Sequence, residues 1–319
     1  MRFPEFSGEW EMASLQDIAA INPKSDQLQN TFIYIDLEAV EKGELRKIQE
    51  IMREEAPSRA QRVINNNDIL FQCVRPYQKN NYIHKILNTS NQQWVASTGY
   101  AQIRTTESPN YIYHLLNTDG FNRKVMVRCT GSSYPAINSE DLATIRFYYT
   151  PDKKEQFKIS RLLDLIDERI ATQNKIIEKL QSLIKGIAQH CIKESTSGNT
   201  YVKLGDICQI TTGKLDANAQ VDNGIYPFFT CAEQPFKIDS FAFDTEALLI
   251  SGNGANLGYI NYYKGKFNAY QRTYVLDLFS ENIQYIKWAL KVLLPKRIAI
   301  EKSSSNTPYI VLSTLTDLR

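Results

Sequence analysis

The sequence has few of the residues on which metal sites and disulfide frameworks depend. Its 319 residues include five cysteines and three histidines, and no two cysteines form a C-x-x-C pair. A zinc site would have almost no ligands to choose from, so we expect no metal. No apolar run reaches the roughly 18 residues of a membrane helix, and the N-terminus carries acids where a secretion signal carries basic residues. We therefore expect a cytoplasmic protein with no membrane contact.

A large excess of either charge is also missing. Lys and Arg number 37 against 35 Asp and Glu, which gives a net charge of +2 and no basic tail. This balance counts mildly against DNA binding, although cations can still gather on one face. The length suits two domains, and 18 Tyr with 14 Phe are typical of β-rich domains or of polar-aromatic binding surfaces.

The clearest pattern that is present lies between Pro151 and Lys193. Apolar residues recur there at alternating spacings of four and three, with Gln173 as the polar exception. This heptad predicts a coiled-coil helix of roughly 60 Å, at about 1.5 Å per residue. The alternative, a helix lying on a globular core, is less favoured because core helices are usually shorter. We expect a subunit interface at Ile159, Leu163, Ile166, Ile170, Ile177, Leu180, Ile184 and Ile187.

The segments on either side of this helix repeat each other in the same order. The matched segments are 15–21 with 204–210, 68–71 with 246–249, 111–116 with 285–290, and 133–137 with 307–310. Their common order predicts a duplicated domain. We therefore expect one domain over 1–150, a helix over 151–194 and a second domain over 195–319.

Short β-rich runs lie between the repeated segments. Examples are 32–35, 125–128 and 274–278. Strands mixed with short helices indicate an α+β fold, with two similar α/β domains separated by a long coiled-coil helix.

Two loops carry the side chains that suit nucleic acid. Segment 72–81 combines Arg, Lys, Gln, Asn and Tyr without an acid, and 253–272 places amides and an arginine near a glycine-rich turn. Amides match adenine edges and arginine matches guanine, while hydroxyls can donate to phosphates. A solvated polar loop explains the same composition. The DNA-binding candidates are Gln72, Arg75, Tyr77, Lys79, Asn80, Ser132, Ser133, Asn253, Asn256, Gln271, Arg272, Ser304, Ser305 and Asn306.

Glycine patterns for nucleotide cofactors fail on their spacing or context. Gly213-Lys214 has Gly205 eight positions before Gly213, too far for a phosphate loop. Gly252, Gly254 and Gly258 follow a predicted strand, but another strand comes next where a dinucleotide turn needs a helix. A hairpin loop is the better interpretation.

The whole chain resembles the specificity subunit of type I restriction-modification systems: a globular domain, a long heptad helix, then a second copy of that domain. The motifs that carry the resemblance are 2–10, Pro151-x-x-x-Glu155-Gln156-x-x-Ile159 continuing to Leu163, Asp167 and Ile170, 251–258, and 304–310. The helix motif is moderately specific, and the others are weaker individually. Asn306-Thr307-Pro308-Tyr309 is only superficially similar to the Asn-Pro-Pro-Tyr of adenine methyltransferases, and no cofactor loop precedes it.

The resemblance implies two target recognition domains that each read one half of a split DNA sequence, with the helices as a spacer. It implies methyltransferase subunits that bind S-adenosylmethionine and a restriction subunit that uses ATP and Mg. The chain itself would then bind double-stranded DNA, hold no cofactor and catalyse nothing. A second conserved helix that the family carries after its second domain is missing from the sequence. We therefore expect the heptad stripe to associate with another copy or with a methyltransferase subunit.

Two other classes of function remain. A coiled-coil scaffold with two related protein-binding lobes fits the near-neutral charge, whereas the split repeat and the acid-free loops favour DNA. An autonomous methyltransferase lacks the cofactor motifs.

Overall fold

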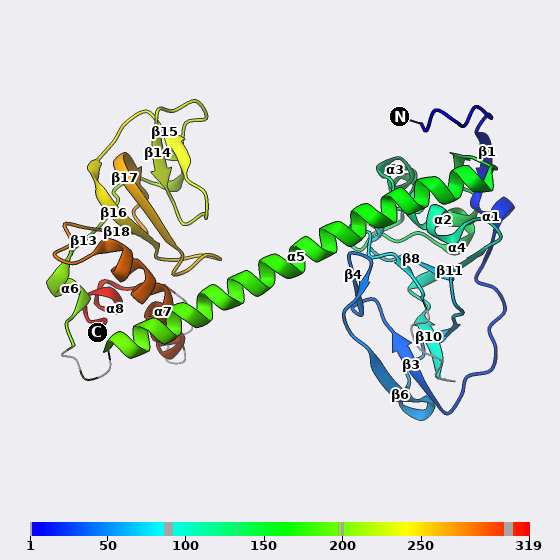
Figure 1. The fold of residues 1–319 in the computed structure, drawn as a ribbon, viewed down its shortest axis with the longest axis horizontal. Helices are drawn as coiled ribbons and strands as arrows, with labels where there is room; N and C mark the ends of the chain where they lie inside the picture. The colour runs from blue at the N-terminus through cyan, green and yellow to red at the C-terminus, as the bar shows by residue number, and fades with distance from the viewer. Residues whose placement is uncertain (1, 86–91, 132, 197, 199–200, 303–308) are drawn as a thin grey trace. The chain divides into compact units, whose positions relative to one another are not determined.

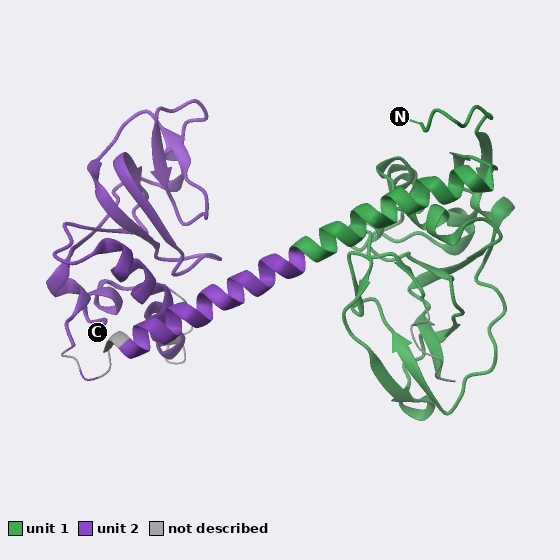
Figure 2. Ribbon diagram, viewed as in Figure 1, with its two compact units in different colours: residues 1–173 green, residues 174–319 purple. Residues whose placement is uncertain are grey.

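A computed structural model describes residues 2–85, 92–131, 133–196, 198, 201–302 and 309–319 (Figure 1). The chain divides into two compact units, Met1–Gln173 and Asn174–Arg319, which are coloured separately in Figure 2. Each unit combines helices with mostly antiparallel sheets. This confirms the predicted α+β fold class, with a long helix between two similar domains in the chain order.

The long helix α5 spans Lys153–Thr196. Asp152 caps its start, because Oδ1 of Asp152 accepts a hydrogen bond of 2.8 Å from the backbone N–H of Lys154. Gly198, with a φ of +78°, follows its end, as is common after helices. The predicted helix is confirmed, and its first turns belong to unit 1 while its last turns belong to unit 2.

Unit 1 holds two four-stranded sheets, in the orders β6-β3-β10-β7 and β2-β11-β8-β9, and the pairs β1-β12 and β4-β5. The strands β3 and β10 run parallel, and the other neighbours run antiparallel. The strands are β1 (Glu11–Ser14), β2 (Ala19–Ile21), β3 (Thr31–Ile35), β4 (Val40–Glu41), β5 (Glu44–Leu45), β6 (Gln49–Met52), β7 (Ala60–Val63), β8 (Ile69–Gln72), β9 (Tyr82–Ile83), β10 (Gln93–Ser97), β11 (Tyr100–Thr105) and β12 (Arg146–Tyr149). The helices are α1 (Leu15–Ile18), α2 (Pro109–Leu116), α3 (Asp119–Arg128) and α4 (Ser139–Ala143).

Unit 2 holds one six-stranded sheet, in the order β13-β18-β16-β17-β14-β15. Strand β14 pairs with β17 in parallel, and the other neighbours are antiparallel. The strands are β13 (Gln209–Thr212), β14 (Tyr226–Phe229), β15 (Phe236–Ile238), β16 (Phe243–Ser251), β17 (Ile260–Ala269) and β18 (Thr273–Asp277). The helices are α6 (Leu204–Ile207), α7 (Ile283–Lys302) and α8 (Leu312–Thr316).

The two units bury corresponding residues in corresponding elements. Ile69 of β8 lies opposite Ile103 of β11, and Leu248 of β16 lies opposite Leu276 of β18. All four side chains are fully buried in their cores. Further buried pairs at matching places are Leu15 with Leu204, Ile112 with Ile286, Leu116 with Leu290, Ile137 with Ile310, and Leu142 with Leu315. The repeat that the sequence predicted is therefore a repeat of the packing.

At one strand the repeat is displaced by a residue. The sequence match of 68–71 with 246–249 equates Ile69 with Ala247, whereas the strand register equates Ile69 with Leu248. Adjacent strand residues point to opposite faces of a sheet. Leu248 accordingly lies in the core cluster that corresponds to that of Ile69, and Ala247 lies in a different cluster.

One predicted β-rich segment is wrong. Residues 125–128 lie in helix α3, although three of the four are β-branched or unbranched apolar residues that suit strands. Thr118 caps this helix, since its side chain accepts a hydrogen bond from the N–H of Phe121. Phe121 and Val125, four positions apart, bury the same face against the core, so tertiary packing overrides local propensity.

Segment 32–35 lies in strand β3, and segment 274–278 lies in strand β18 except for Leu278, which follows the end of that strand. The glycines after β16 form a hairpin loop because β17 pairs antiparallel with β16. Within the described part of the chain, no helix is both long enough and apolar enough for a bilayer.

Candidate nucleic-acid interface

In unit 1 the polar loop after β8 is fastened by backbone hydrogen bonds to two other segments. The N–H of Cys73 donates to the carbonyl of Gly99, at the turn between β10 and β11, over 3.0 Å. The N–H of Ile137 donates to the carbonyl of Cys73, also over 3.0 Å. Arg75 donates its own N–H to the carbonyl of Pro135 at 2.8 Å. Loop 73–81, the β10–β11 turn and segment 133–137 thus form one surface.

Unit 2 repeats the first two of these three hydrogen bonds. The N–H of Gly252 donates to the carbonyl of Arg272 at 2.8 Å, and the N–H of Ile310 donates to the carbonyl of Gly252 at 2.8 Å. Gly252 therefore occupies the place of the first residue of the unit 1 loop, and Arg272 lies in the turn that precedes β18. The sequence repeat brings the two predicted DNA loops to equivalent positions.

The two loops also share their backbone conformation. Arg75 and Lys79 have φ values of 55° and 53°, and Gly254 and Gly258 have 79° and 81° at the matching places. Glycine adopts this left-handed region freely, but other residues lose roughly 1–2 kcal/mol in it. Unit 1 thus places an arginine and a lysine at a conformational cost that unit 2 avoids. Strained residues of this kind gather at functional sites.

Arg75 lies over an aromatic ring. Its guanidinium carbon is 4.5 Å from the ring centre of Tyr134, which is a cation–π contact. Tyr134 is itself 63% exposed, so the stack faces solvent. Sequence reasoning missed Tyr134, because no local pattern links it to a residue 59 positions earlier.

The Arg75 side chain borders a hollow on the surface of unit 1. The hollow is lined by Leu37, Glu38, Val40, Glu41, Arg46, Gln72, Val74, Arg75, Gln78, Asn80 and Tyr134. Arg46 is paired with Glu41 and Glu44 at 3.6 and 3.0 Å, which leaves Glu38 as an unpaired carboxylate within the described residues. The hollow therefore offers both hydrogen-bond donors and hydrogen-bond acceptors to a ligand.

The prediction that Gln72 contacts DNA does not agree with the burial of its side chain. It is 3% exposed, its Nε2 donates to Gln78 at 3.0 Å, and its Oε1 accepts from the N–H of Asn80 at 3.1 Å. The Gln72 amide therefore shapes the loop from inside and is not available to bases. Asn80 is engaged as well, since its Oδ1 accepts a 3.0 Å hydrogen bond from the N–H of Lys42.

The other loop candidates of unit 1 differ in their availability. Lys79 donates to Asp119 Oδ1 at 2.5 Å and to the carbonyl of Asn117 at 3.3 Å, and this ion pair lowers the pKa of Asp119. Tyr77 is 52% exposed and Ser133 is exposed. Tyr77 and Ser133 are the candidates that stay open to a ligand, together with Arg75.

In unit 2 two of the predicted amides are engaged within the protein. Nδ2 of Asn256 donates to the carbonyl of Cys231 at 3.1 Å, and Nε2 of Gln271 donates to Asp216 Oδ1 at 2.8 Å. Asn253 is half-buried, and Arg272 is exposed with no ion pair to any described residue. Ser132, Ser304, Ser305 and Asn306 lie outside the described residues.

The predicted subunit interface on α5 divides into two parts. Ile159 packs partly buried against the core of unit 1, and Leu163 lines a hollow with Tyr111 and Phe147 of the same unit. Both side chains are half-buried within unit 1, and their place in a subunit interface stays a prediction. The remaining six are about half exposed: Ile166, Ile170, Ile177, Leu180, Ile184 and Ile187. We call these six residues the α5 stripe.

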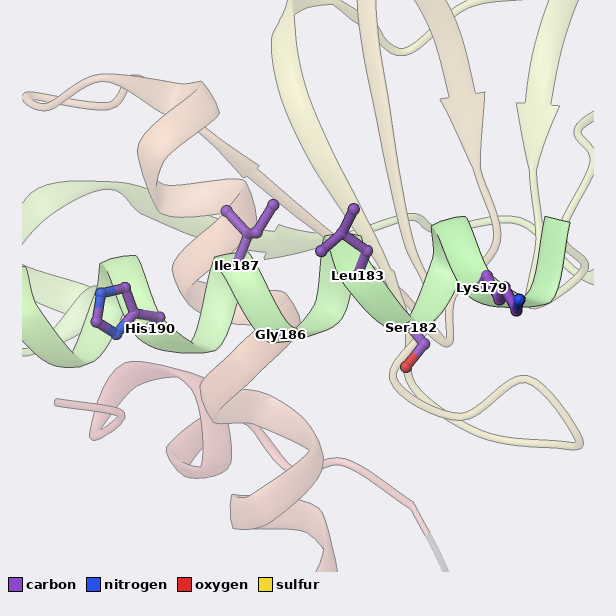
Figure 3. Close-up of a pocket in the computed structure, with 6 residues that line it drawn as sticks. All are labelled: Lys179, Ser182, Leu183, Gly186, Ile187 and His190. Carbon is purple, nitrogen blue, oxygen red and sulfur yellow. The ribbon is translucent and has the colours of Figure 1, made fainter. Parts of the chain in front are cut away.

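Close to the C-terminal end of α5, a shallow hollow follows the helix surface. It is lined by Lys179, Ser182, Leu183, Gly186, Ile187 and His190, and Figure 3 shows Leu183 and Ile187 pointing to the same side. A Cβ at Gly186 would meet no heavy atom of the described residues within 4 Å, so the surface is open there. No group of three metal-binding side chains occurs in the described portion.

Comparison with known proteins gives a consistent result. The family described as "Type I restriction modification DNA specificity domain" matches residues 7–182 and again residues 196–319. The EcoDI type I restriction enzyme specificity subunit of Escherichia coli is 46% identical over 117 residues, which are 37% of this chain and 26% of that protein. A Mycoplasma genitalium protein named as a type I specificity subunit is 23% identical over 230 residues, or 66% of this chain and 58% of that protein. The matches thus span under two thirds of either relative.

Solved structures share the fold. The S subunit of a type I restriction-modification system from M. genitalium matches with a TM-score of 0.63 and 17% identity, over 97% of this chain and 83% of that one. A chain from a study of type I R-M complex assembly and conformational transition matches with a TM-score of 0.58 and 21% identity, over 97% and 84%. At these identities the likeness concerns the fold.

Proposed function

The chain belongs to the family of type I restriction-modification DNA specificity domains, and from that premise we propose that it reads a bipartite DNA target for a type I complex. Unit 1 reads one half of the target and unit 2 reads the other. The proposal rests above all on the duplicated loop frame, in which each unit carries one arginine without an ion pair to any described residue: Arg75 in the loop of unit 1 and Arg272 in the turn of unit 2. Two copies of one reading surface suit a target with two halves.

The partners follow from the same assignment. We propose that methyltransferase subunits dock on the assembly and supply S-adenosylmethionine, and that a restriction subunit supplies ATP- and Mg-dependent translocation and cleavage. The chain contributes recognition without catalysis, in the cytoplasm. The α5 stripe is the proposed contact with a helix of a methyltransferase subunit or of a second copy, because six half-exposed aliphatic residues form a hydrophobic surface.

The near-neutral charge favours the second candidate, a scaffold whose two lobes bind proteins. Against it stands the acid-free loop of unit 1, where Arg75 is held ready at a backbone cost. The lobes of a scaffold have no need of a stacked, unpaired guanidinium.

Binding of duplex DNA at several salt concentrations tests the choice. The chain, assembled with its methyltransferase subunits, is mixed with a labelled pool of duplexes in which two blocks are randomised. We expect affinity to fall steeply with salt, because phosphate contacts release counterions. We also expect the bound fraction to be enriched in two short sequences at a fixed spacing. Salt-independent or absent binding would favour the scaffold.

A further inference from the structure

Arginine and glycine exchange places between the two units. In unit 1 the left-handed loop position carries Arg75 and the turn position carries Gly99, whereas in unit 2 the left-handed position carries Gly254 and the turn position carries Arg272. We infer that each unit reads one guanine through this single arginine, and that the exchange makes the two units read guanine at different places in their half-sites. The inference rests on the proposed function.

The equivalence of the positions is fixed by hydrogen bonds. The turn positions are matched because each accepts, through its carbonyl, the N–H of the first loop residue in its unit, at 3.0 Å for Gly99 and 2.8 Å for Arg272. The loop positions are matched because each accepts, through its carbonyl, the N–H of the residue three further on, at 3.0 Å for Arg75 and 3.2 Å for Gly254. The two positions are therefore equivalent in the backbone, and the residues that occupy them differ between the units.

Both guanidinium groups are available. Among the described residues, neither Arg75 nor Arg272 forms a side-chain hydrogen bond or an ion pair, in contrast to Arg2, Arg46 and Arg104. The guanidinium of Arg75 lies over the ring of Tyr134 and makes a cation–π contact with it. A planar group with two parallel N–H donors and no internal partner matches the O6 and N7 acceptors of guanine.

The surroundings of Arg75 favour a base over a phosphate. The hollow that it borders also holds the unpaired carboxylate of Glu38, the Glu41–Arg46 ion pair, and the amides of Gln78 and Asn80. Carboxylates repel a phosphate, but they can accept from the exocyclic amine of a cytosine. A Cβ at Gly99 would lie 2.9 Å from the side chain of Leu37, so a larger residue at this turn position would displace a side chain that lines the hollow.

The two arginines should contact guanines at different positions of their half-sites, because they belong to different segments of the frame. Position 75 belongs to the loop after β8, and position 272 to the turn before β18. A side chain that leaves from the loop and one that leaves from the turn enter a groove from different sides of the shared frame. The half-site of unit 1 therefore holds its guanine at a different position, relative to the frame, from the half-site of unit 2.

Selection of bound duplexes by the full complex tests the inference. With Arg75→Ala, we expect one position of one half-site to lose its guanine preference by roughly ten- to a hundredfold, while the other half-site is unchanged. Arg272→Ala should do the same in the other half. Lys266→Ala is the control, since Lys266 lies at the other end of the β16–β17 hairpin, over Phe241, and should leave both halves unchanged.

The exchange itself is tested in unit 2. Arg272→Gly removes the guanine preference, and adding Gly254→Arg should create a guanine preference at another position of the same half-site. The new side chain has room, because no heavy atom of the described residues lies within 4 Å of a Cβ at Gly254, and Arg75 shows that arginine tolerates this backbone. A double variant without any guanine preference overturns the exchange.

The outcomes separate this inference from the proposed function. If the unaltered complex selects no sequence, the proposed function fails. If it selects two half-sites but both alanine variants weaken all sequences equally, the arginines contact phosphates and only the inference fails.

Discussion

Arg2 holds the carboxylate of Glu155 in a two-pronged ion pair, with Nε 2.6 Å from Oε1 and Nη2 2.7 Å from Oε2. Glu155 is fully buried in the first turn of α5, where Thr150 Oγ1 donates to it at 2.7 Å and Trp10 Nε1 at 3.4 Å. These bonds fasten the N-terminal segment to the long helix within unit 1. They also hold the pKa of Glu155 down at about 2, chiefly through the hydrogen bonds from Arg2.

This pair should make the stability of unit 1 depend on pH in the acid range. Because the pKa of Glu155 is lower in the folded chain than its ordinary value of 4.5, the ionised carboxylate stabilises the fold above about pH 4.5. The contribution is lost as the pH falls from there toward about 2. We expect Arg2→Ala to lower the free energy of unfolding at neutral pH, because it leaves a buried carboxylate without its main partner. Urea unfolding at neutral and acid pH measures the difference.

The deficit of Arg2→Ala should shrink as the pH falls. Lys203→Ala serves as the control. Both side chains of the Lys203–Asp317 ion pair are exposed, so its removal should change the free energy of unfolding much less. A deficit of Arg2→Ala that stays constant down to the acid limit would contradict the role of Glu155.

Asp164 joins α5 to α2 inside unit 1. Its Oδ1 lies 2.7 Å from Nε2 of His114, and its Oδ2 accepts from Nδ2 of Asn110 at 2.6 Å. We expect Asp164→Ala to reduce the free energy of unfolding by about 2 kcal/mol, because the largely buried His114 and the partly buried Asn110 lose their partner. Glu168→Ala, an exposed acid one turn further along α5, should be nearly neutral. Equal effects of the two variants would argue against the network.

Gln72 should support the reading loop without contacting bases. We expect Gln72→Ala to destabilise unit 1 by about 1–2 kcal/mol, since it removes the hydrogen bonds to Gln78 and Asn80 from a buried site. Binding should weaken for all DNA sequences alike. Gln61→Ala, which removes an exposed amide bonded to the carbonyl of Ser58, is the matched control. A changed base preference at one position would instead make Gln72 a reader.

Ile177 lies in the α5 stripe and is 51% exposed. We expect Ile177→Asp to leave the stability of the chain nearly unchanged and to abolish association through the stripe, because a carboxylate cannot be buried in an apolar seam without a partner. Light scattering and co-purification with the methyltransferase subunit measure this. Lys175→Asp, an exposed change of charge two positions away, should preserve assembly. Sequence preference should be the same in any complex that still forms.

Leu116 and Leu290 occupy matching places in the two cores. We expect Leu116→Ala and Leu290→Ala each to cost about 3 kcal/mol, because both side chains are almost completely buried. Hydrogen exchange should show loss of protection in unit 1 for the first variant and in unit 2 for the second. Loss of protection in both units from either change would mean that they unfold together.

Much of the fold follows from local sequence. The heptad from Ile159 to Ile187 determines a helix because apolar residues at a spacing of four and three lie on one side of it. The repeated segments indicate a duplicated domain, since the matching segments place a leucine or isoleucine at corresponding positions of the two cores. Their order along the chain carries this information, and no long-range contact is needed to see it.

The candidate loops were found from their composition, but the composition could not rank their members. Gln72 and Arg75 are equally polar in the sequence, yet Gln72 points into the loop and Arg75 lies on Tyr134 at its surface. The face that a strand residue presents depends on register, and the one-residue shift at Leu248 was invisible for that reason.

The sequence by itself determined the helix, the duplication and the polar loops, because periodicity and repetition are properties of neighbouring residues. Only the tertiary structure decided which loop residues are open, and that Arg75 and Arg272 stand at different positions of one frame. Those facts depend on backbone hydrogen bonds between segments far apart in the chain, such as Cys73 with Gly99 and Gly252 with Arg272. Such bonds form between backbone groups that every residue except proline has, so the residue type does not predict them.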